Sequence, residues 1–199
     1  MLKDLLKKSR SIRRFYEEDE VPEEMIRDWV DNARYTPSTA NGQTLKFRIC
    51  TSQEDKEIIF PNLKWAGALP DWDGPEPGER PGAYVLIFDD LSLAKNRPVD
   101  TGICAQTIML SAAEAGYGGC MLASVNRPEV MRGLGIDQER YALALVLAIG
   151  RPKETVMLVP VGEDGSTKYY RDPDGIHYVP KRGRRIVAMS FCEPRSCSP

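Results

Sequence analysis

The sequence predicts a layered domain of helices and buried strands, in the α/β or α+β class. Two continuous apolar runs, residues 84–88 and 143–149, are typical of strands that are buried on both faces of a sheet. Segments with apolar residues at helical spacing alternate with these runs. A chain of 199 residues is long enough to bury one sizeable core. We find no internal repeat and expect residues 1–199 to form a single domain.

The expected elements can be justified in chain order. Residues 1–8 predict a short helix, because Leu2, Leu5 and Leu6 fall on one side and lysines on the other. A second helix starts at Pro22, since proline is favoured in a first turn, and extends to about Tyr35. The remaining expectations are a strand at 47–50, helix at 53–60, strand at 84–88, helix at 100–116, strand at 120–123, helix at 128–134, strand at 143–149 and a last strand at 185–189.

The segment 100–116 is the most apolar of the expected helices. Apolar residues occupy nearly all sides of it, from Ile103 to Ala115. A helix of this kind is either central to a core or buried in an interface between chains.

Residues 66–82 differ from the rest of the chain because glycine and proline are crowded into them. Regular structure is not expected there, and long irregular loops in compact domains are usually functional or disordered. Trp65 and Trp72 favour an ordered loop over a floppy linker. We therefore interpret residues 66–82 as a lid over a substrate site, with Trp65 and Trp72 as its aromatic contacts.

Composition excludes several function classes. The net charge of −2 argues against a nucleic-acid partner, and no apolar run is long enough to span a membrane. The first residues lack the apolar core of a signal peptide, so a cytoplasmic protein with five reduced cysteines is expected. No metal site is expected, because His177 is the only histidine and no cysteine pair is suitably spaced. His177 has no accompanying nucleophile motif, which indicates a structural or loop-exposed side chain.

Three polar segments stand out as candidate binding residues. Arg10-Ser11-Ile12-Arg13-Arg14 and Lys181-Arg182 are basic, and arginine forks match phosphate oxygens. The segment 36–43 carries hydroxyls and amides, which can donate or accept hydrogen bonds at the polar edge of a ligand. Each segment also has an ordinary interpretation, either a solvated basic stretch or a polar turn.

The segment 116–124, Gly-Tyr-Gly-Gly-Cys-Met-Leu-Ala-Ser, follows the most apolar expected helix. Its glycines end a helix, whereas the glycines of a dinucleotide fingerprint open one, so that motif is not present. The ordinary interpretation is a glycine helix stop before a core strand.

Taken together, these segments resemble the nitroreductase family of FMN-dependent oxidoreductases over residues 10 to about 182. The most specific match is Pro-Ser-x-x-Asn-x-Gln at residues 37–43, and a basic Arg-Ser-x-Arg-x-Phe segment starts at Arg10. The chain departs from many relatives in having Ser9 where they have an arginine, and Thr44-Leu45 where they have Pro-Trp.

The resemblance implies a set of cofactor-binding residues. Arg10, Ser11 and Arg13, with Lys181 and Arg182, would hold the FMN phosphate. Ser38, Thr39, Asn41 and Gln43 would reach the flavin of the partner subunit. Met121, Leu122, Ala123 and Ser124 would run past the flavin ring, with a backbone N–H of Ala123 or Ser124 pointing at N5. Residues 183–199 lie outside the resemblance and are expected to be a C-terminal tail.

The resemblance also implies a fold and an activity. The fold would be α+β in three layers, with a mixed, mostly antiparallel central sheet flanked by helices, in a homodimer with composite sites. FMN would carry hydride from NADH or NADPH, through N5, to a small planar acceptor such as a nitroaromatic compound or a quinone, so no catalytic side chain is expected. Two alternatives are a flavin carrier or sensor without reductase turnover, and a degenerate family member with a structural role.

Overall fold

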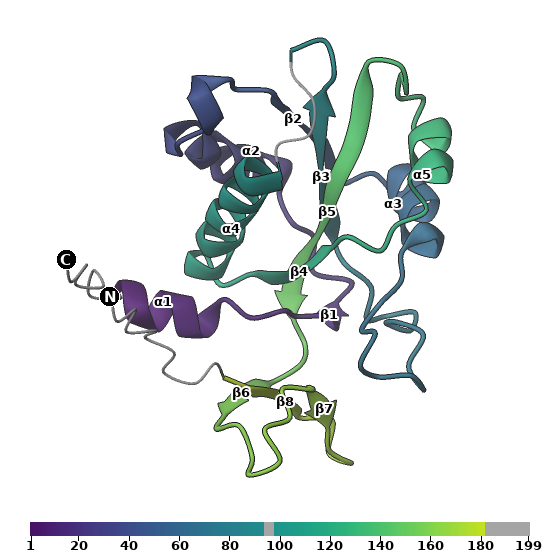
Figure 1. The fold of residues 1–199 in the computed structure, drawn as a ribbon. Helices are drawn as coiled ribbons and strands as arrows, with labels where there is room; N and C mark the ends of the chain where they lie inside the picture. Colours follow the sequence, from purple (N-terminus) through teal and green to yellow (C-terminus); the bar gives the residue numbers. More distant parts are fainter. Residues whose placement is uncertain (94–97, 182–199) are drawn as a thin grey trace, which may run out of the picture.

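The computed structural model describes residues 1–93 and 98–181 (Figure 1). Its centre is a five-stranded sheet in which every pair of strands is antiparallel. The strand order is β1 (Phe15–Tyr16), β5 (Tyr141–Pro152), β3 (Ala83–Asp90) and β2 (Leu45–Cys50), and β4 (Gly118–Leu122) also pairs with β5.

Helices cover both faces of this sheet (Figure 1). On one face lie α2 (Glu23–Asn32) and α4 (Pro98–Glu114), and on the other lie α3 (Gln53–Ile59) and α5 (Arg127–Gly133). α1 (Leu2–Lys8) lies beside the end of α4, and none of its residues is buried. The expected class, an α+β fold in three layers, is confirmed. None of the helices in the described residues is long and apolar enough to cross a membrane.

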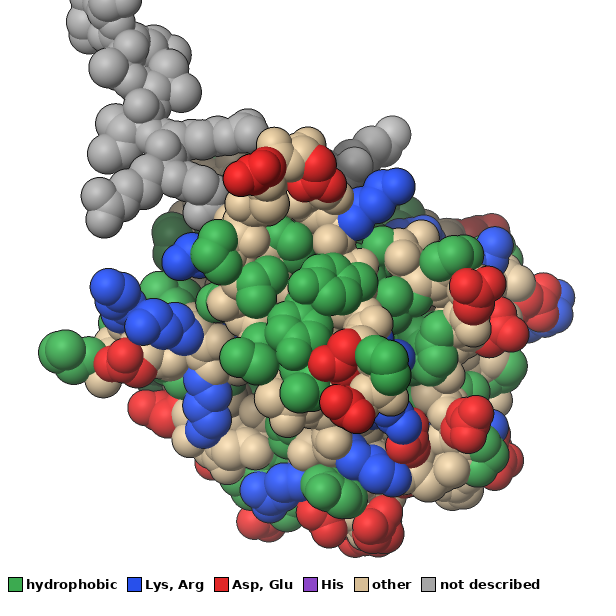
Figure 2. Space-filling view, turned by 90° about the horizontal axis from the view of Figure 1, so that it is seen from below, with side chains coloured by type: hydrophobic (Ala, Val, Ile, Leu, Met, Phe, Trp, Pro, Cys, Tyr) green, Lys and Arg blue, Asp and Glu red, His purple; other side chains and the backbone are tan. Residues whose placement is uncertain are grey.

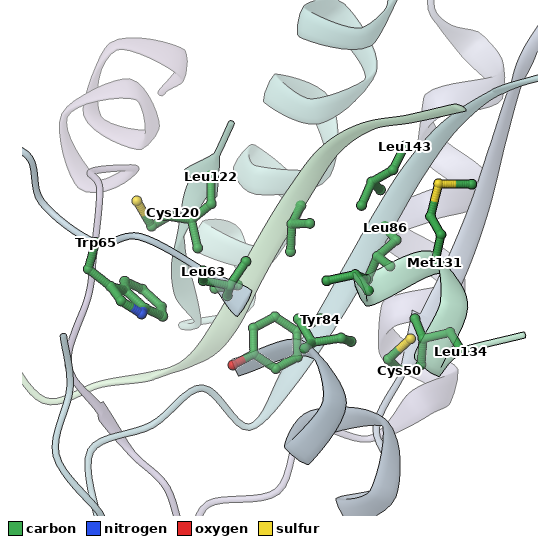
Figure 3. Close-up of a cluster of buried hydrophobic side chains, with 14 of the residues drawn as sticks. Cys50, Leu63, Trp65, Tyr84, Leu86, Cys120, Leu122, Met131, Leu134 and Leu143 are labelled. Carbon is green, nitrogen blue, oxygen red and sulfur yellow. The ribbon is translucent and has the colours of Figure 1, made fainter. Parts of the chain in front are cut away.

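The two central strands form the interior on both of their faces. All eight residues of β3 are buried, as the continuous apolar run predicts. Because side chains alternate along a strand, Tyr84 and Leu86 join one hydrophobic cluster while Val85 and Ile87 join the other. Figure 3 shows the first cluster, with Trp65 beside Leu63 and Cys120 on one side and Met131 of α5 on the opposite side.

The other expected elements are also confirmed where the structure describes them. The expected helix at 100–116 corresponds to α4, which begins slightly earlier. A 3-10 helix, Ala33–Tyr35, follows α2, and another, Phe60–Asn62, follows α3. A third short 3-10 helix, Thr39–Asn41, follows Ser38. The expected strand at 185–189 lies outside the described residues.

Sequence analysis did not predict the small sheet that follows β5. It consists of β6 (Val156–Val159), β8 (His177–Pro180) and β7 (Tyr170–Arg171), with β6 and β8 parallel. This sheet projects below the main sheet (Figure 1), where Tyr170 and Tyr178 stack with ring centroids 5.1 Å apart. Viewed from below, basic side chains on this face alternate with acidic and hydrophobic ones and form no continuous basic surface (Figure 2).

Candidate functional site

The N-terminal basic segment lies against β4. Ser11 forms a parallel bridge with Gly119, and the Ile12 N–H donates to the Gly119 carbonyl at 2.9 Å. Gly119 itself approaches β5 so closely that a Cβ there would lie 2.1 Å from the Ala148 carbonyl oxygen. Only glycine allows this approach, so it fixes the position of the basic segment relative to the sheet.

Two arginines of this segment carry buried donors. The Nε atoms of Arg10 and Arg13 are buried and have no hydrogen-bond partner among the described residues. Arg10 and Ile12 line a cavity of about 270 Å³ together with Lys7 and Lys8. The Arg13 guanidinium lies 4.9 Å from the Tyr169 ring centroid. Orphaned cationic donors of this kind fit an anionic group such as a phosphate.

Glu154 holds the basic segment against the small sheet. Its carboxylate accepts the backbone N–H of Arg13 and, at 2.8 Å, a guanidinium N–H of Arg171. The His177 Nδ1 lies 3.7 Å from the same carboxylate, and His177 is fully buried. The structural interpretation of His177 is therefore correct, and the loop-exposed alternative is wrong.

The second basic segment lies at the end of this small sheet. Lys181 follows β8, and its backbone N–H donates to the Val159 carbonyl at 2.8 Å. Arg182 lies outside the described residues. Arg14 forms a bidentate pair with Glu79, so its guanidinium already has a carboxylate partner.

The polar loop 38–43 is anchored at the start of α4. The Thr39 hydroxyl donates to Asp100 at 2.7 Å, and the Thr39 N–H lies 3.0 Å from both carboxylate oxygens. Asp100 is only 2% exposed and lies in the first turn of α4, where the helix dipole favours a negative charge. Thr39 is thus engaged by Asp100, and its expected contact with flavin stays a prediction.

This loop also has an unusual backbone. Ala40, Asn41 and Gln43 all have positive φ, a conformation that residues other than glycine rarely adopt. Such conformations concentrate at functional sites. Ser38, Asn41 and Gln43 line a cavity of about 450 Å³, and the side chains of Asn41 and Gln43 are joined by a hydrogen bond of 3.1 Å.

The chain after β4 lines a third cavity. Ala123 and Ser124 are exposed there, in a cavity of about 590 Å³ that Asn62 and Lys64 also line. The Ser124 carbonyl accepts the Lys64 N–H at 2.9 Å. Of the other two expected residues, Met121 is exposed and Leu122 is buried in the core. The Ser124 N–H donates to no backbone carbonyl among the described residues, so it suits the polar edge of a planar heterocycle.

Residues 66–82 contain no helix or strand, and they leave the rim of this third cavity directly after Lys64. Trp65 is buried and its ring is tilted against that of Phe60, with centroids 6.1 Å apart, so it anchors the start of the loop (Figure 3). Trp72 is half-buried, with the Arg171 guanidinium 4.2 Å from its ring centroid. The Ala68 N–H donates to the Tyr169 hydroxyl at 3.2 Å. The loop is therefore docked on the small sheet.

The expected site residues form two separate groups. The basic segment bridges Gly119 of β4, which follows the C-terminal end of α4, whereas loop 38–43 is bonded to Asp100 at the N-terminal end of α4. A helix of 17 residues is about 25 Å long. One chain therefore does not bring its own loop 38–43 to its own basic segment.

The described residues provide neither a reactive thiol nor a cluster of metal ligands. Cys50, Cys104 and Cys120 are free and buried, and burial raises the pKa of the Cys50 thiol to about 12. Such thiols are inert as nucleophiles. Within residues 1–93 and 98–181 no group of three or more His, Cys, Asp or Glu side chains could hold a metal ion.

Sequence reasoning missed three residues that organise these groups: Asp100, Arg127 and Glu154. Asp100 and Arg127 each lie in the first turn of a helix, and the local sequence pattern there indicates only that a helix begins. Glu154 follows β5 in a polar stretch. A carboxylate between two successive strands would have been a signal for Glu154, but the following strand β6 was not predicted.

The chain is similar to known proteins in sequence and in fold. A model described as "Nitroreductase family" matches residues 6–151. The "Putative NADH dehydrogenase/NAD(P)H nitroreductase" of Methanothermobacter thermautotrophicus is 29% identical over 180 residues, which cover 87% of this chain and 84% of that protein. A nitroreductase family protein of Streptococcus pneumoniae has a similar fold, with a TM-score of 0.65 and 17% identity over 79% of this chain and 93% of that one.

A second solved structure, a "putative nitroreductase in complex with FMN" from Exiguobacterium sibiricum, has a TM-score of 0.63 and 18% identity. The match covers 77% of this chain and 89% of that one. At these identities the two structures establish the fold alone.

Glu154→Gln tests the buried network. Burial raises the pKa of Glu154, but the neighbouring His177 imidazole and the hydrogen bonds from the Arg13 amide and Arg171 outweigh burial, and the net pKa is lowered. The carboxylate therefore stabilises the fold above its ordinary pKa of about 4.3, and this contribution is lost as the pH falls through the lower folded-state value. We expect Glu154→Gln to lower the free energy of unfolding by about 3 kcal/mol near pH 7.

The measurement is urea unfolding at a series of pH values, with the exposed Glu163→Gln as the control. The difference between wild type and Glu154→Gln should shrink below about pH 4. A difference that stays constant down to pH 3 would contradict the assignment.

Proposed function

Because the chain belongs to the nitroreductase family, we propose that it is an FMN-dependent oxidoreductase that reduces a small planar acceptor with NADH or NADPH. Nitroaromatic compounds and quinones are acceptors of this kind. The observation that carries the proposal is the pairing of the basic segment with β4. It places arginine Nε atoms that are buried and have no partner among the described residues at one end of that strand, and the exposed residues Ala123 and Ser124 just beyond its other end.

The residues present fit FMN at both ends. Arg13 and Ser11, with Arg10, Lys181 and Arg182, would hold the phosphate, since arginine forks bind phosphate bidentately. The backbone of Ala123 and Ser124 would bind the ring edge. FMN, when bound, supplies the redox chemistry by accepting a hydride equivalent from the nicotinamide and passing it to the acceptor. The protein's own tasks are to bind, orient and exclude water, so we assign no catalytic side chain.

Relatives support this assignment of cofactors. The Methanothermobacter relative is named for NADH and NAD(P)H chemistry, and the Exiguobacterium structure is described as a complex with FMN. Neither name identifies an acceptor for this chain, and the described residues contain no separate motif that would favour NADH or NADPH.

The proposed functional unit is a homodimer with two composite sites. Loop 38–43 and the basic segment lie at opposite ends of α4, so a second copy is needed to bring them to one ligand. The outer side of α4 carries Val99, Ile103 and Leu110, which are exposed or half-buried although they are apolar. Together with Leu2 and Leu6 on α1, they form a surface suited to burial between two chains.

We further propose that residues 66–82 shape the access of the acceptor. The loop starts at the rim of the cavity that Ala123 and Ser124 line, and it is held by contacts of Trp72 and Ala68 with the small sheet. An aromatic loop docked in this way can restrict which flat molecules enter.

The first prediction concerns the cofactor. Purified protein should be yellow with FMN and should oxidise NADH or NADPH when a quinone is added, which a carrier, a sensor or a structural protein would not do. Arg13→Gln should lower the affinity for FMN by about 10- to 100-fold, because a charge-assisted contact to phosphate is worth about 1.5–3 kcal/mol. Fluorescence titration of the apoprotein with FMN measures this affinity. Unchanged affinity in a folded variant would remove Arg13 from the phosphate site.

The second prediction concerns the composite site. Arg13→Gln damages one half of each site, and Asn41→Ala/Gln43→Ala damages the other half. Co-expression of the two variants should restore about a quarter of the intact sites, since random pairing gives heterodimers with one intact site each. Co-expression of Arg13→Gln with Lys181→Ala is the control, because both changes lie in the same half and no intact site forms. Equal FMN binding in both mixtures would refute the composite site.

The third prediction concerns the loop. Trp72→Ala removes the indole that packs under Arg171, which should loosen the loop. The KM for the acceptor should therefore change several-fold, while FMN stays bound. Steady-state kinetics with a quinone and with a nitroaromatic compound test this. Unchanged kinetics with both acceptors would show that the loop does not control access.

A further inference from the structure

Arg127 occupies the place where β4 separates from β5. The ladder between these strands ends at the pair of Leu122 and Val146. Beyond it, the Arg127 Nε donates to the Leu143 carbonyl at 2.8 Å, and its Nη2 donates to the Ala123 carbonyl at 3.0 Å. A longer contact of 3.4 Å reaches the Ala144 carbonyl. The guanidinium thus bridges two strand backbones where their own hydrogen bonds have stopped.

This bridge fixes one particular peptide unit. The carbonyl of Ala123 and the N–H of Ser124 belong to the same planar trans peptide, so they point in opposite directions. With the carbonyl held by Arg127, the Ser124 N–H is directed away from the guanidinium. That N–H donates to no backbone carbonyl among the described residues, and Ser124 is exposed in the cavity that Lys64 also lines.

The next peptide unit is held as well. The Ser124 carbonyl accepts the Lys64 N–H at 2.9 Å, and Val125 forms an antiparallel bridge with Leu63. Two successive carbonyls are therefore clamped from different elements, α5 and the segment before the loop. A donor held this rigidly needs no reorganisation when a ligand arrives.

We propose that Arg127 is a positioning residue for the flavin ring, which orients the Ser124 N–H as the donor to the ring nitrogen N5. This inference rests on the proposed function. Arg127 also lines the cavity beside Ser124, and in this proposal it acts through the Ala123–Ser124 peptide, whose carbonyl it holds. A lysine lacks the planar fork with which an arginine can hold two separate carbonyls.

The proposal predicts the sign of a change in reduction potential. N5 of oxidised FMN only accepts a hydrogen bond, whereas N5 of reduced FMN carries a hydrogen that opposes an N–H donor. Losing the oriented donor should therefore weaken the binding of oxidised FMN more than the binding of reduced FMN, which raises the midpoint potential of the bound flavin. Loss of a nearby positive charge alone would act in the opposite direction, because a cation favours the more electron-rich reduced form.

The experiment compares Arg127→Gln and Arg127→Lys with wild type. Arg132→Gln is the control, because Arg132 lies on the same helix, is exposed and pairs with Glu129. The dissociation constants of oxidised and reduced FMN are measured by anaerobic titration of apoprotein, and the midpoint potential by dye equilibration. We expect Arg127→Lys and Arg127→Gln to raise the dissociation constant of oxidised FMN by roughly threefold to tenfold more than that of reduced FMN. A tenfold difference corresponds to a rise of about 30 mV for a two-electron couple.

Arg127→Lys separates orientation from charge, since it keeps the cation but not the fork. A rise in potential in both variants, with Arg132→Gln unchanged, supports the proposal. An unchanged or lowered potential in folded Arg127→Lys overturns it. Failure of the wild-type apoprotein to bind FMN would instead overturn the proposed function, so the two failures are distinguishable.

Discussion

The antiparallel ladder between β3 and β5 is the constraint on which the other features depend. Both strands are buried on both faces, so this ladder separates two hydrophobic clusters and fixes the helices that cover each of them. β5 also carries β4 and β1 along its other edge. Gly119 can approach Ala148 only because it lacks a side chain, and the basic segment then pairs with Gly119. The site is therefore positioned by backbone contacts that begin in the core.

Much of this core was predictable because its signals are local. The apolar runs at 84–88 and 143–149 indicate buried strands without knowledge of their partners, and the apolar segment at 100–116 indicates a buried helix. The small sheet gave no such signal. β6 and β8 pair in parallel across a polar connection, and β7 has only two residues. Their pairing depends on the buried carboxylate of Glu154 and on Arg171, which no periodic pattern reveals.

The sequence predicted the residues of the candidate site that would contact a ligand, but not the residues that hold the binding segments in place. The pattern at 37–43 and the segment at Arg10 are recognisable because residue type and spacing matter for binding. Asp100 accepts from Thr39, 61 residues away in the sequence, and Arg127 donates to the Leu143 carbonyl, 16 residues away, so local residue spacing carries no information about these contacts. The positive φ values at Ala40, Asn41 and Gln43 were equally hidden, since none of these residues is a glycine.

The length of α4 has a consequence for where the chain can vary. α4 sets the separation between the Asp100 anchor at one end and the Gly118–Gly119 approach at the other. One inserted residue would turn one end relative to the other by about 100° and shift it by about 1.5 Å, which would misplace both groups together. The loop 66–82 is held at separate points, at Trp72 by Arg171 and at Glu79 by Arg14, and no helix or strand links these points. Changes in chain length are thus compatible with this architecture in the loop, and incompatible with it inside α4.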